Sequence, residues 1–293
     1  MPVLSFADSI QHAQKNGYKL PLVRVSSLPQ ARGVMAAARE EDAPLALAIG
    51  GEELEGGLFP SLEALARESR AALSLAALGV KTEEQAVQAV RLGVSALIPE
   101  TGIESAELEK VREIGGSCGV PVLLETEIRD HVLELDGELE KASLRVLTKN
   151  PDSWRELDGL LRNAGESCAR EAVEKAGAKG RGGPAAKDSR SWNPVEHLII
   201  YNTTADEAAS KELAREGRRV LDRIPGVRAT WSGRSVKEDA AYRWCWLIRF
   251  AQPAVIESYR DHPEHVAYAD NHFRPQAGDR ISIDYQLTGA DET

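Results

Sequence analysis

The sequence predicts two domains of different class: an α/β domain with a parallel sheet over residues 1–172 and a smaller α+β domain over residues 193–293. Before about residue 172, short apolar runs alternate with helical stretches, whereas after residue 193 the order becomes β-α-β-β-α-β. Residues 173–192 lie mostly in a stretch rich in Gly, Ala, Lys and Arg, and we expect them to form a flexible linker. A chain of 293 residues is comfortable for two such domains.

In the first domain, six short apolar runs are typical of buried parallel strands. These runs are Leu20–Val25, Pro44–Ile49, Ala71–Ala77, Ala96–Ile98, Val120–Leu124 and Leu144–Leu147. Helical stretches lie between them, and two of these stretches, Thr82–Leu92 and Ser105–Ile114, begin with capping residues. A closed eight-fold barrel usually needs about 250 residues. We therefore expect an incomplete TIM-like barrel or an open parallel sheet.

The second domain is predicted to contain four strands and three helices, in the split βαβ arrangement. The strands are Glu196–Asn202, Arg228–Arg234, Tyr242–Phe250 and Arg280–Thr288; the helices are Asp206–Ile224, Pro253–Arg260 and Pro263–Phe273. Helices of this topology cover only one face of the sheet. Because strand Tyr242–Phe250 carries large side chains on both faces, we expect sheet-to-sheet packing, with a second copy favoured over the first domain. A large aromatic core within a monomer is the alternative.

Composition excludes several classes of protein. The net charge of −10 argues against a general nucleic-acid binder and gives no support for binding to anionic membranes. No apolar run approaches the roughly 20 residues of a membrane helix, and the N-terminus has no secretory signal pattern. The three cysteines are scattered and lack zinc-type spacing. We expect a cytoplasmic protein whose partners are a small molecule and a second copy, without metal or other cofactor.

The segment from Tyr259 to His265 (YRDHPEH) is the strongest candidate for chemistry. Residues before a proline avoid helical geometry, so one helix should end near His262 and the next should begin at Pro263. His265 then lies in a first helical turn, where the helix dipole disfavours the charged imidazolium. A neutral imidazole is a suitable general base, and the phenol of Tyr259 is suited to stabilise an enolate. Alternatively, the two histidines only satisfy backbone groups around the bend.

Four sequences in this domain resemble the stress-responsive dimeric α/β-barrel (Dabb) family: EHLIIYN, IPGV, RFAQPAVIESYRDHPEHVAYADNHFRP and ISIDYQL. The resemblance covers about residues 195–288 and implies a ferredoxin-like subunit that pairs sheet against sheet into a dimeric α/β barrel. The family includes olivetolic acid cyclase, which performs an intramolecular aldol condensation without a cofactor. The resemblance implies that His265 is the base, that Tyr259 assists it, and that His197 also belongs to the site.

Three further residues are expected to contact the substrate. Trp231 and Trp246 are candidate walls of the pocket, because tryptophans are concentrated in this domain. His262 lies within the same Y-x-x-H-P-x-H element as the proposed acid–base pair.

The first domain has a weaker resemblance, carried by NGYKLPLVRVSSLPQARGVMAAAREEDAPLALAIG. This segment is similar to the opening of class II fructose-bisphosphate aldolases, which are metal-dependent TIM barrels. Their third strand carries an H-x-D-H pattern, but the corresponding residues here are Ser74-Leu75-Ala76-Ala77. Glu125 remains, and one carboxylate does not make a metal site. We therefore expect a truncated aldolase-like scaffold that has lost the aldolase chemistry.

Together these features predict a cofactor-independent lyase or cyclase. Its substrate would be a small reactive carbonyl compound, polyketide-like or an aromatic precursor, and its chemistry would be of the aldol type in the second domain. Two alternatives stay open: a non-catalytic small-ligand-binding or assembly protein that dimerises through this domain, and a cofactor-independent monooxygenase.

Overall fold

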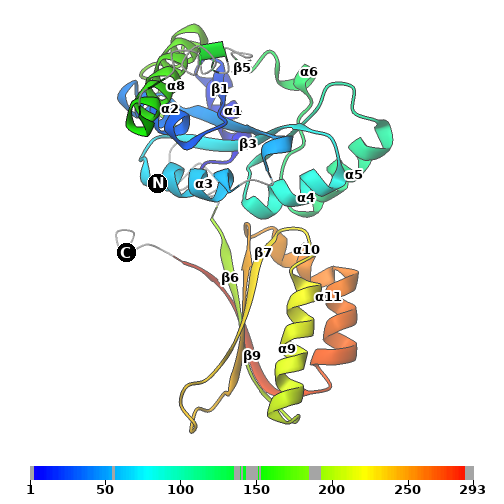
Figure 1. Cartoon of the computed structure of the whole chain (residues 1–293). Helices are drawn as coiled ribbons and strands as arrows, with labels where there is room; N and C mark the ends of the chain where they lie inside the picture. Colours follow the sequence, from blue (N-terminus) through cyan, green and yellow to red (C-terminus); the bar gives the residue numbers. More distant parts are fainter. Residues whose placement is uncertain are drawn as a thin grey trace. The chain divides into compact units, whose positions relative to one another are not determined.

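The structure is a computed structural model that describes residues 3–54, 57–134, 139, 141–142, 151, 153–184 and 193–287. It divides into two compact units (Figure 1). The first unit comprises residues 1–116 and 120–192, and the second comprises residues 193–293 together with 117–119. In the described part of the chain, no helix is long and apolar enough to cross a membrane.

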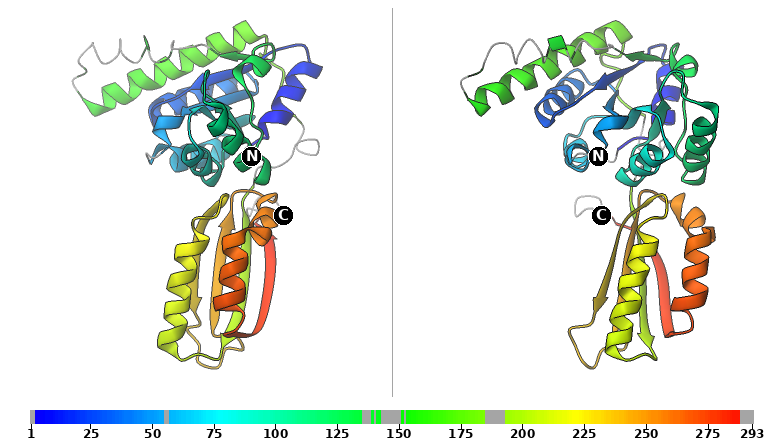
Figure 2. Two further views of the ribbon diagram at one scale, coloured as in Figure 1. Left: turned by 90° about the vertical axis from the view of Figure 1, so that its right-hand side faces the viewer. Right: turned by 45° about the vertical axis from the view of Figure 1, so that its right-hand side comes forward.

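The first unit is a parallel half-barrel sheet surrounded by helices (Figure 2). The described elements are α1 (Phe6–Lys15), β1 (Leu20–Arg24), α2 (Leu28–Glu40), β2 (Leu45–Gly50), η1 (Gly51–Glu53), α3 (Leu58–Glu68), β3 (Leu73–Val80), α4 (Glu83–Leu92), β4 (Ala96–Pro99), α5 (Ser105–Ser117), α6 (Glu125–Ile128), β5 (Val132–Glu134) and α8 (Trp154–Ala176). The strand order is β4-β3-β2-β1-β5, and neighbouring strands are parallel. All six residues of β2 are buried, as expected for a strand covered on both faces.

The first four predicted strands are confirmed, and the remaining two have different outcomes. Val120–Leu124 forms only an isolated bridge, between Leu97 and Val122, instead of a strand. Leu144–Leu147 lies outside the described residues. The observed fifth strand, β5, is short and ends in an acidic residue, so it lacks the apolar run that identifies a buried strand.

Helices α2 and α8 pack closely along each other, and glycines make this approach possible. A Cβ atom added at Gly165 would clash with the carbonyl oxygen of Gln30, and one added at Gly33 would clash with the carbonyl oxygen of Arg162. Beside this contact, the guanidinium of Arg170 forms ion pairs with carboxylates from both helices, including Glu166 at 2.9 Å.

The predicted start of the linker, residue 173, is too early. Residues 173–176 belong to α8, where Val173 and Ala176 are buried. Beyond the helix, the backbone N–H of Gly180 donates to the Glu41 carbonyl and that of Gly182 donates to the Asp42 carbonyl, both at 2.9 Å. Small residues therefore dock against the end of α2, a contact that composition does not reveal. Residues 185–192 lie outside the described residues.

The second unit has the predicted β-α-β-β-α-β order, with its second helical segment divided in three. The elements are β6 (Val195–Thr203), α9 (Glu207–Leu221), β7 (Val227–Arg234), β8 (Trp244–Phe250), α10 (Val255–Asp261), α11 (Pro263–Tyr268), the π-helical turn η2 (Ala269–Phe273) and β9 (Ala277–Gln286). The antiparallel sheet has the order β7-β8-β6-β9, which is the ferredoxin-like arrangement. The helices cover one face of it (Figure 1).

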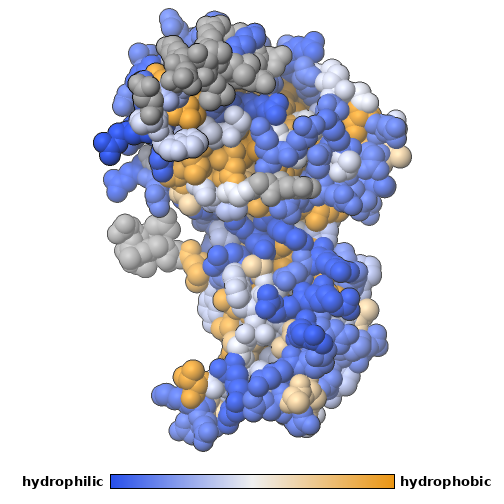
Figure 3. All heavy atoms as spheres, in the orientation of Figure 1, coloured by the Kyte–Doolittle hydropathy of each residue, from blue (hydrophilic) through white to orange (hydrophobic). Residues whose placement is uncertain are grey.

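The two faces of this sheet differ in burial. On the helix-covered face, Trp246, Ile248 and Phe250 of β8 are fully buried. The outer surface over α9 and α11 is mostly hydrophilic (Figure 3). On the opposite face, Ile281, Ile283 and Tyr285 of β9 are each more than 40% exposed. The described residues of this unit thus leave one apolar sheet face uncovered.

The contact between α2 and α8 can be tested with a pair of glycine substitutions in α8. Gly165→Ala should lower the free energy of unfolding by about 1–3 kcal/mol, because the added methyl group overpacks the contact with Gln30. Gly159→Ala is the matched control: nothing lies within 4 Å of its added Cβ. The control should raise the free energy of unfolding by up to about 1 kcal/mol through helix propensity. Urea unfolding followed by far-UV circular dichroism measures both, and an unchanged Gly165→Ala variant would contradict the packing.

Candidate active site

A break between two helices positions the candidate base. Helix α10 ends at Asp261 and α11 begins at Pro263, as the sequence predicts. Between them, His262 has extended backbone geometry, and its Nδ1 accepts a 3.3 Å hydrogen bond from the backbone N–H of Glu264. His262 is therefore the N-cap of α11. It does not line the cavity described below, and its contact with substrate stays a prediction.

The imidazole of His265 is held by the end of the preceding helix. Its Nδ1 lies 2.9 Å from the carbonyl oxygen of Arg260. Because a carbonyl only accepts hydrogen bonds, Nδ1 must carry the proton, and the neutral ring keeps its lone pair on Nε2. Burial lowers the pKa of His265 and outweighs the hydrogen bond to the Arg260 carbonyl, which raises it; the positive charge of Arg274 acts in the same direction as burial. The ring is thus a neutral base, and burial rather than the helix dipole is the main cause of its lowered pKa.

Tyr259 lies directly against this imidazole. The two ring centroids are 4.3 Å apart, and the tyrosine is 3% exposed. Burial raises the pKa of Tyr259 far above its usual value, so the phenol stays protonated and acts as a hydrogen-bond donor. Among the described residues, no group forms a hydrogen bond with its hydroxyl. The hydroxyl therefore remains available to a ligand.

His197 joins the cluster from the first strand of this unit. It is directly opposite Asp284 in the β6–β9 register, and its Nδ1 is 2.7 Å from the carboxylate Oδ1. The ring stacks on Phe250 at 5.7 Å and lies 6.0 Å from the ring of Tyr259. The structure therefore brings together the three residues that the sequence proposed as catalytic. Asp284 was missed, because only the strand register shows that it faces His197.

A cavity of about 380 Å³ opens beside this cluster. It is lined by His197, Ile199, Phe250, Ile256, Tyr259, Arg260, His265, Ala269, Phe273, Arg274, Arg280, Ser282 and Asp284. Its volume lies within the usual range for small-molecule sites, and its walls combine apolar side chains with a few polar groups. Arg260 and Arg274 are paired with Asp261 and Asp270, respectively. The cavity suits a small, partly apolar ligand that carries carbonyl or anionic oxygens.

The two tryptophans proposed as pocket walls lie on opposite faces of the sheet. Trp246 is buried under the helices and lines a space of about 30 Å³ that also touches Tyr259 and His265. Trp231 is opposite Leu247 in the register, on the uncovered face. There it is 44% exposed and carries the guanidinium of Arg249 over its ring at 5.5 Å. The prediction for Trp231 is therefore corrected: it does not line the cavity of its own subunit.

In the first unit, Ser74 to Ala77, where the sequence resemblance would place the H-x-D-H pattern, are buried within β3. Glu125 is engaged with the hydroxyl of Thr101 and the guanidinium of Arg129. In the described ranges, no group of three or more His, Cys, Asp or Glu side chains is placed to hold a metal ion.

Comparison with known proteins identifies the second unit. Residues 195–287 match the family model of the stress responsive A/B barrel domain, Dabb. The second unit is therefore a Dabb domain with a ferredoxin-like fold, joined to an aldolase-like half-barrel. A search of curated proteins found no significant match.

Solved structures resemble each unit separately. A Dabb family protein from Mesorhizobium loti is 23% identical, with 33% of this chain and 99% of that chain covered and a TM-score of 0.31. The YdjI aldolase from Escherichia coli K12 is 13% identical, with 61% and 99% covered and a TM-score of 0.52. SnoaB, a cofactor-independent oxygenase from Streptomyces nogalater, is 10% identical, with 34% and 99% covered and a TM-score of 0.30. The resemblance to the aldolase shows a shared fold only.

The protonation of His265 is directly measurable. Because burial lowers its pKa, its NMR titration midpoint should lie below 6.5, and the ring should be neutral at pH 7. A buried neutral histidine binds protons more readily in the unfolded chain, so its contribution to stability should decline as the pH falls below 6.5. His265→Gln should reduce that decline. A midpoint at or above 6.5 would contradict the proposed environment.

Proposed function

We propose that the Dabb domain is a cofactor-independent enzyme that performs aldol-type chemistry on a small reactive carbonyl compound, polyketide-like or an aromatic precursor. The observation that carries the proposal is the pairing of a neutral imidazole with a protonated phenol at the wall of a 380 Å³ cavity. A solid core in place of this cavity would have favoured a purely structural role for the two residues. The cavity favours binding and turnover of a ligand.

The reaction follows from the two side chains. Nε2 of His265 removes a proton from the carbon next to a carbonyl, and the Tyr259 hydroxyl donates a hydrogen bond to the enolate oxygen that forms. The enolate carbon then attacks a second carbonyl carbon, which forms the new C–C bond. The imidazolium returns its proton to the resulting alkoxide. Proton count and charge are thereby restored, and each residue is ready for another cycle.

His197 is proposed to assist through its partner carboxylate. Asp284 accepts the Nδ1–H of His197, which fixes the tautomer and leaves Nε2 free to accept a hydrogen bond. Its ring is placed by stacking on Phe250. His197 therefore suits a role in orienting a hydroxyl group of the substrate, while the imidazole of His265 carries the proton transfer.

The catalytic proposal is tested with a panel of β-polyketones and phenolic precursors. His265→Ala should lower kcat by about 10²–10⁴-fold, because it removes the general base. Tyr259→Phe should lower kcat with a smaller effect on KM, because its hydrogen bond strengthens as the enolate forms. Product formation is measured by liquid chromatography and mass spectrometry.

His272→Ala is the matched control, since His272 is an exposed histidine of the same unit that does not line the cavity. Dioxygen uptake is recorded in parallel. Unchanged turnover in His265→Ala would overturn the mechanism, and stoichiometric uptake of dioxygen would identify a monooxygenase instead.

We further propose that this domain pairs two copies of the chain through its uncovered sheet face. Assembly through this domain is thus the second candidate function. The specific observation is the row of exposed apolar side chains on β9, Ile281, Ile283 and Tyr285, with Trp231 on the same face at the opposite edge strand, β7. Exposed apolar side chains on one sheet face are costly in water and are typical of protein interfaces. A two-fold axis would bury the same surface on both copies.

Pairing is tested by placing a charge on that face. Ile283→Lys should convert the dimer to a monomer, because the buried ammonium would lack a partner. Val266→Lys is the matched control, because Val266 is 40% exposed, like Ile283 at 41%, but lies on helix α11. Sedimentation velocity measures both. A monomeric wild-type chain, or a dimer that tolerates Ile283→Lys, would contradict the proposal.

A further inference from the structure

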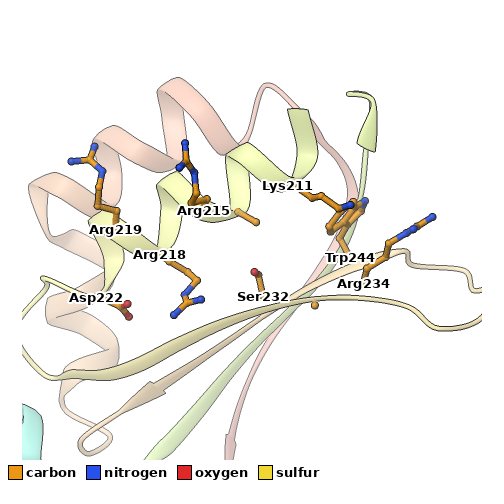
Figure 4. Close-up of a pocket in the computed structure, with 10 residues that line it drawn as sticks. Lys211, Arg215, Arg218, Arg219, Asp222, Ser232, Arg234 and Trp244 are labelled. Carbon is orange, nitrogen blue, oxygen red and sulfur yellow. The ribbon is translucent and has the colours of Figure 1, made fainter. Parts of the chain in front are cut away.

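A second cavity, of about 500 Å³, lies at the opposite edge of the helix-covered face, between α9 and the edge strand β7 (Figure 4). It is lined by Lys211, Ala214, Arg215, Arg218, Arg219, Asp222, Ser232, Gly233, Arg234 and Trp244. None of these residues lines the cavity beside His265. The proposed aldol chemistry makes no use of it.

The lining of this cavity is strongly basic. Five of its ten residues are Lys or Arg, and Asp222 is its one acidic member. Residues 211–234 contain seven basic and three acidic side chains, a net charge of +4, whereas the whole chain has −10. A concave basic surface on an acidic protein concentrates the local field and attracts anions.

Ordinary structural roles account for only part of this charge. Arginines in the last turns of a helix interact favourably with the helix dipole, and this accounts for the positions of Arg218 and Arg219 on α9. Lys211 comes from an earlier turn and Arg234 from β7, and both approach the same carboxylate, Glu207, at 2.8 and 3.2 Å. Lys211 and Arg234, from two separate elements, thus meet at one carboxylate beside the groove.

Arg218 is the central cation. Its guanidinium extends from α9 toward the sheet, between Asp222 and Ser232 (Figure 4). Among the described residues it has no ion-pair partner, whereas Arg215 is paired with Glu212 at 2.7 Å. A guanidinium that faces a hydroxyl across a groove suits the geometry of a phosphate, which accepts paired hydrogen bonds from arginine.

An aromatic surface lies next to these cations. Trp244 also lines an adjoining cavity of about 150 Å³, and Arg234 is shared between the two spaces. The adjoining cavity is also lined by Asn202 and Ser210, whose side chains are fixed by hydrogen bonds to the backbone of Ala241, Arg243 and Asp206. A phosphate site and a ring site therefore meet at the indole.

We propose that this groove binds an aromatic phosphate of the nucleoside diphosphate class. The phosphates lie against Arg218, and the base stacks on Trp244. This site is independent of the acid–base cluster at His265.

The test is isothermal titration calorimetry of the full chain with ADP and with inorganic pyrophosphate. ADP should bind once per chain, at least about tenfold more tightly than pyrophosphate, because stacking adds to the phosphate contacts. Arg218→Gln should weaken ADP binding by about tenfold or more, because it removes a charged hydrogen-bond donor. Raising the salt concentration should weaken it further.

Two control variants separate this site from others. Arg223→Gln removes an exposed arginine just beyond α9 that does not line the cavity, and it should leave ADP binding unchanged. His265→Ala should also leave it unchanged, even if that variant has lost all turnover. Absence of saturable ADP binding, equal affinity for pyrophosphate, or equal weakening by Arg223→Gln would each overturn the proposal.

Discussion

The second unit depends on the interruption of one helix before Pro263. In a continuous helix, the Arg260 carbonyl would accept from the N–H of residue 264. Proline prevents that geometry, so both groups need other partners. Nδ1 of His262 accepts a hydrogen bond from the N–H of Glu264, and the imidazole of His265 donates a hydrogen bond to the Arg260 carbonyl. This single interruption of the helix thus makes His262 the N-cap of α11 and fixes the tautomer of His265.

The reactive character of the site follows from what surrounds that break. The fixed imidazole lies on the covered face of the sheet, where Tyr259 packs against its ring and Phe250 packs against Tyr259. Loss of hydration lowers the pKa of His265 and raises that of Tyr259, so at neutral pH one group accepts a proton and the other donates a hydrogen bond. Burial therefore assigns opposite roles to two groups that touch each other.

The sequence predicts well those features that arise from neighbouring residues. The proline-directed bend, the four strands of the second unit and the first four apolar strands of the first unit all depend on short segments, and the structure has each of them. Features that depend on distant segments were missed. Asp284 meets His197 only through the β6–β9 register, and the docking of residues 177–184 depends on the end of α2. The separation of Trp231 from Trp246 also comes from the register between β7 and β8.

The strict alternation of a β-strand lets this small domain keep several surfaces apart. Along β8, Trp246 and Ile248 pack under the helices, while the intervening Leu247 faces the opposite side. Helices cover one face, and gaps remain at its two edges, one beside His265 and one beside Arg218. The other face stays apolar and open to assembly. Because each residue contributes to only one face, a charge introduced on the open face need not disturb the acid–base cluster, and the three surfaces can be altered one at a time.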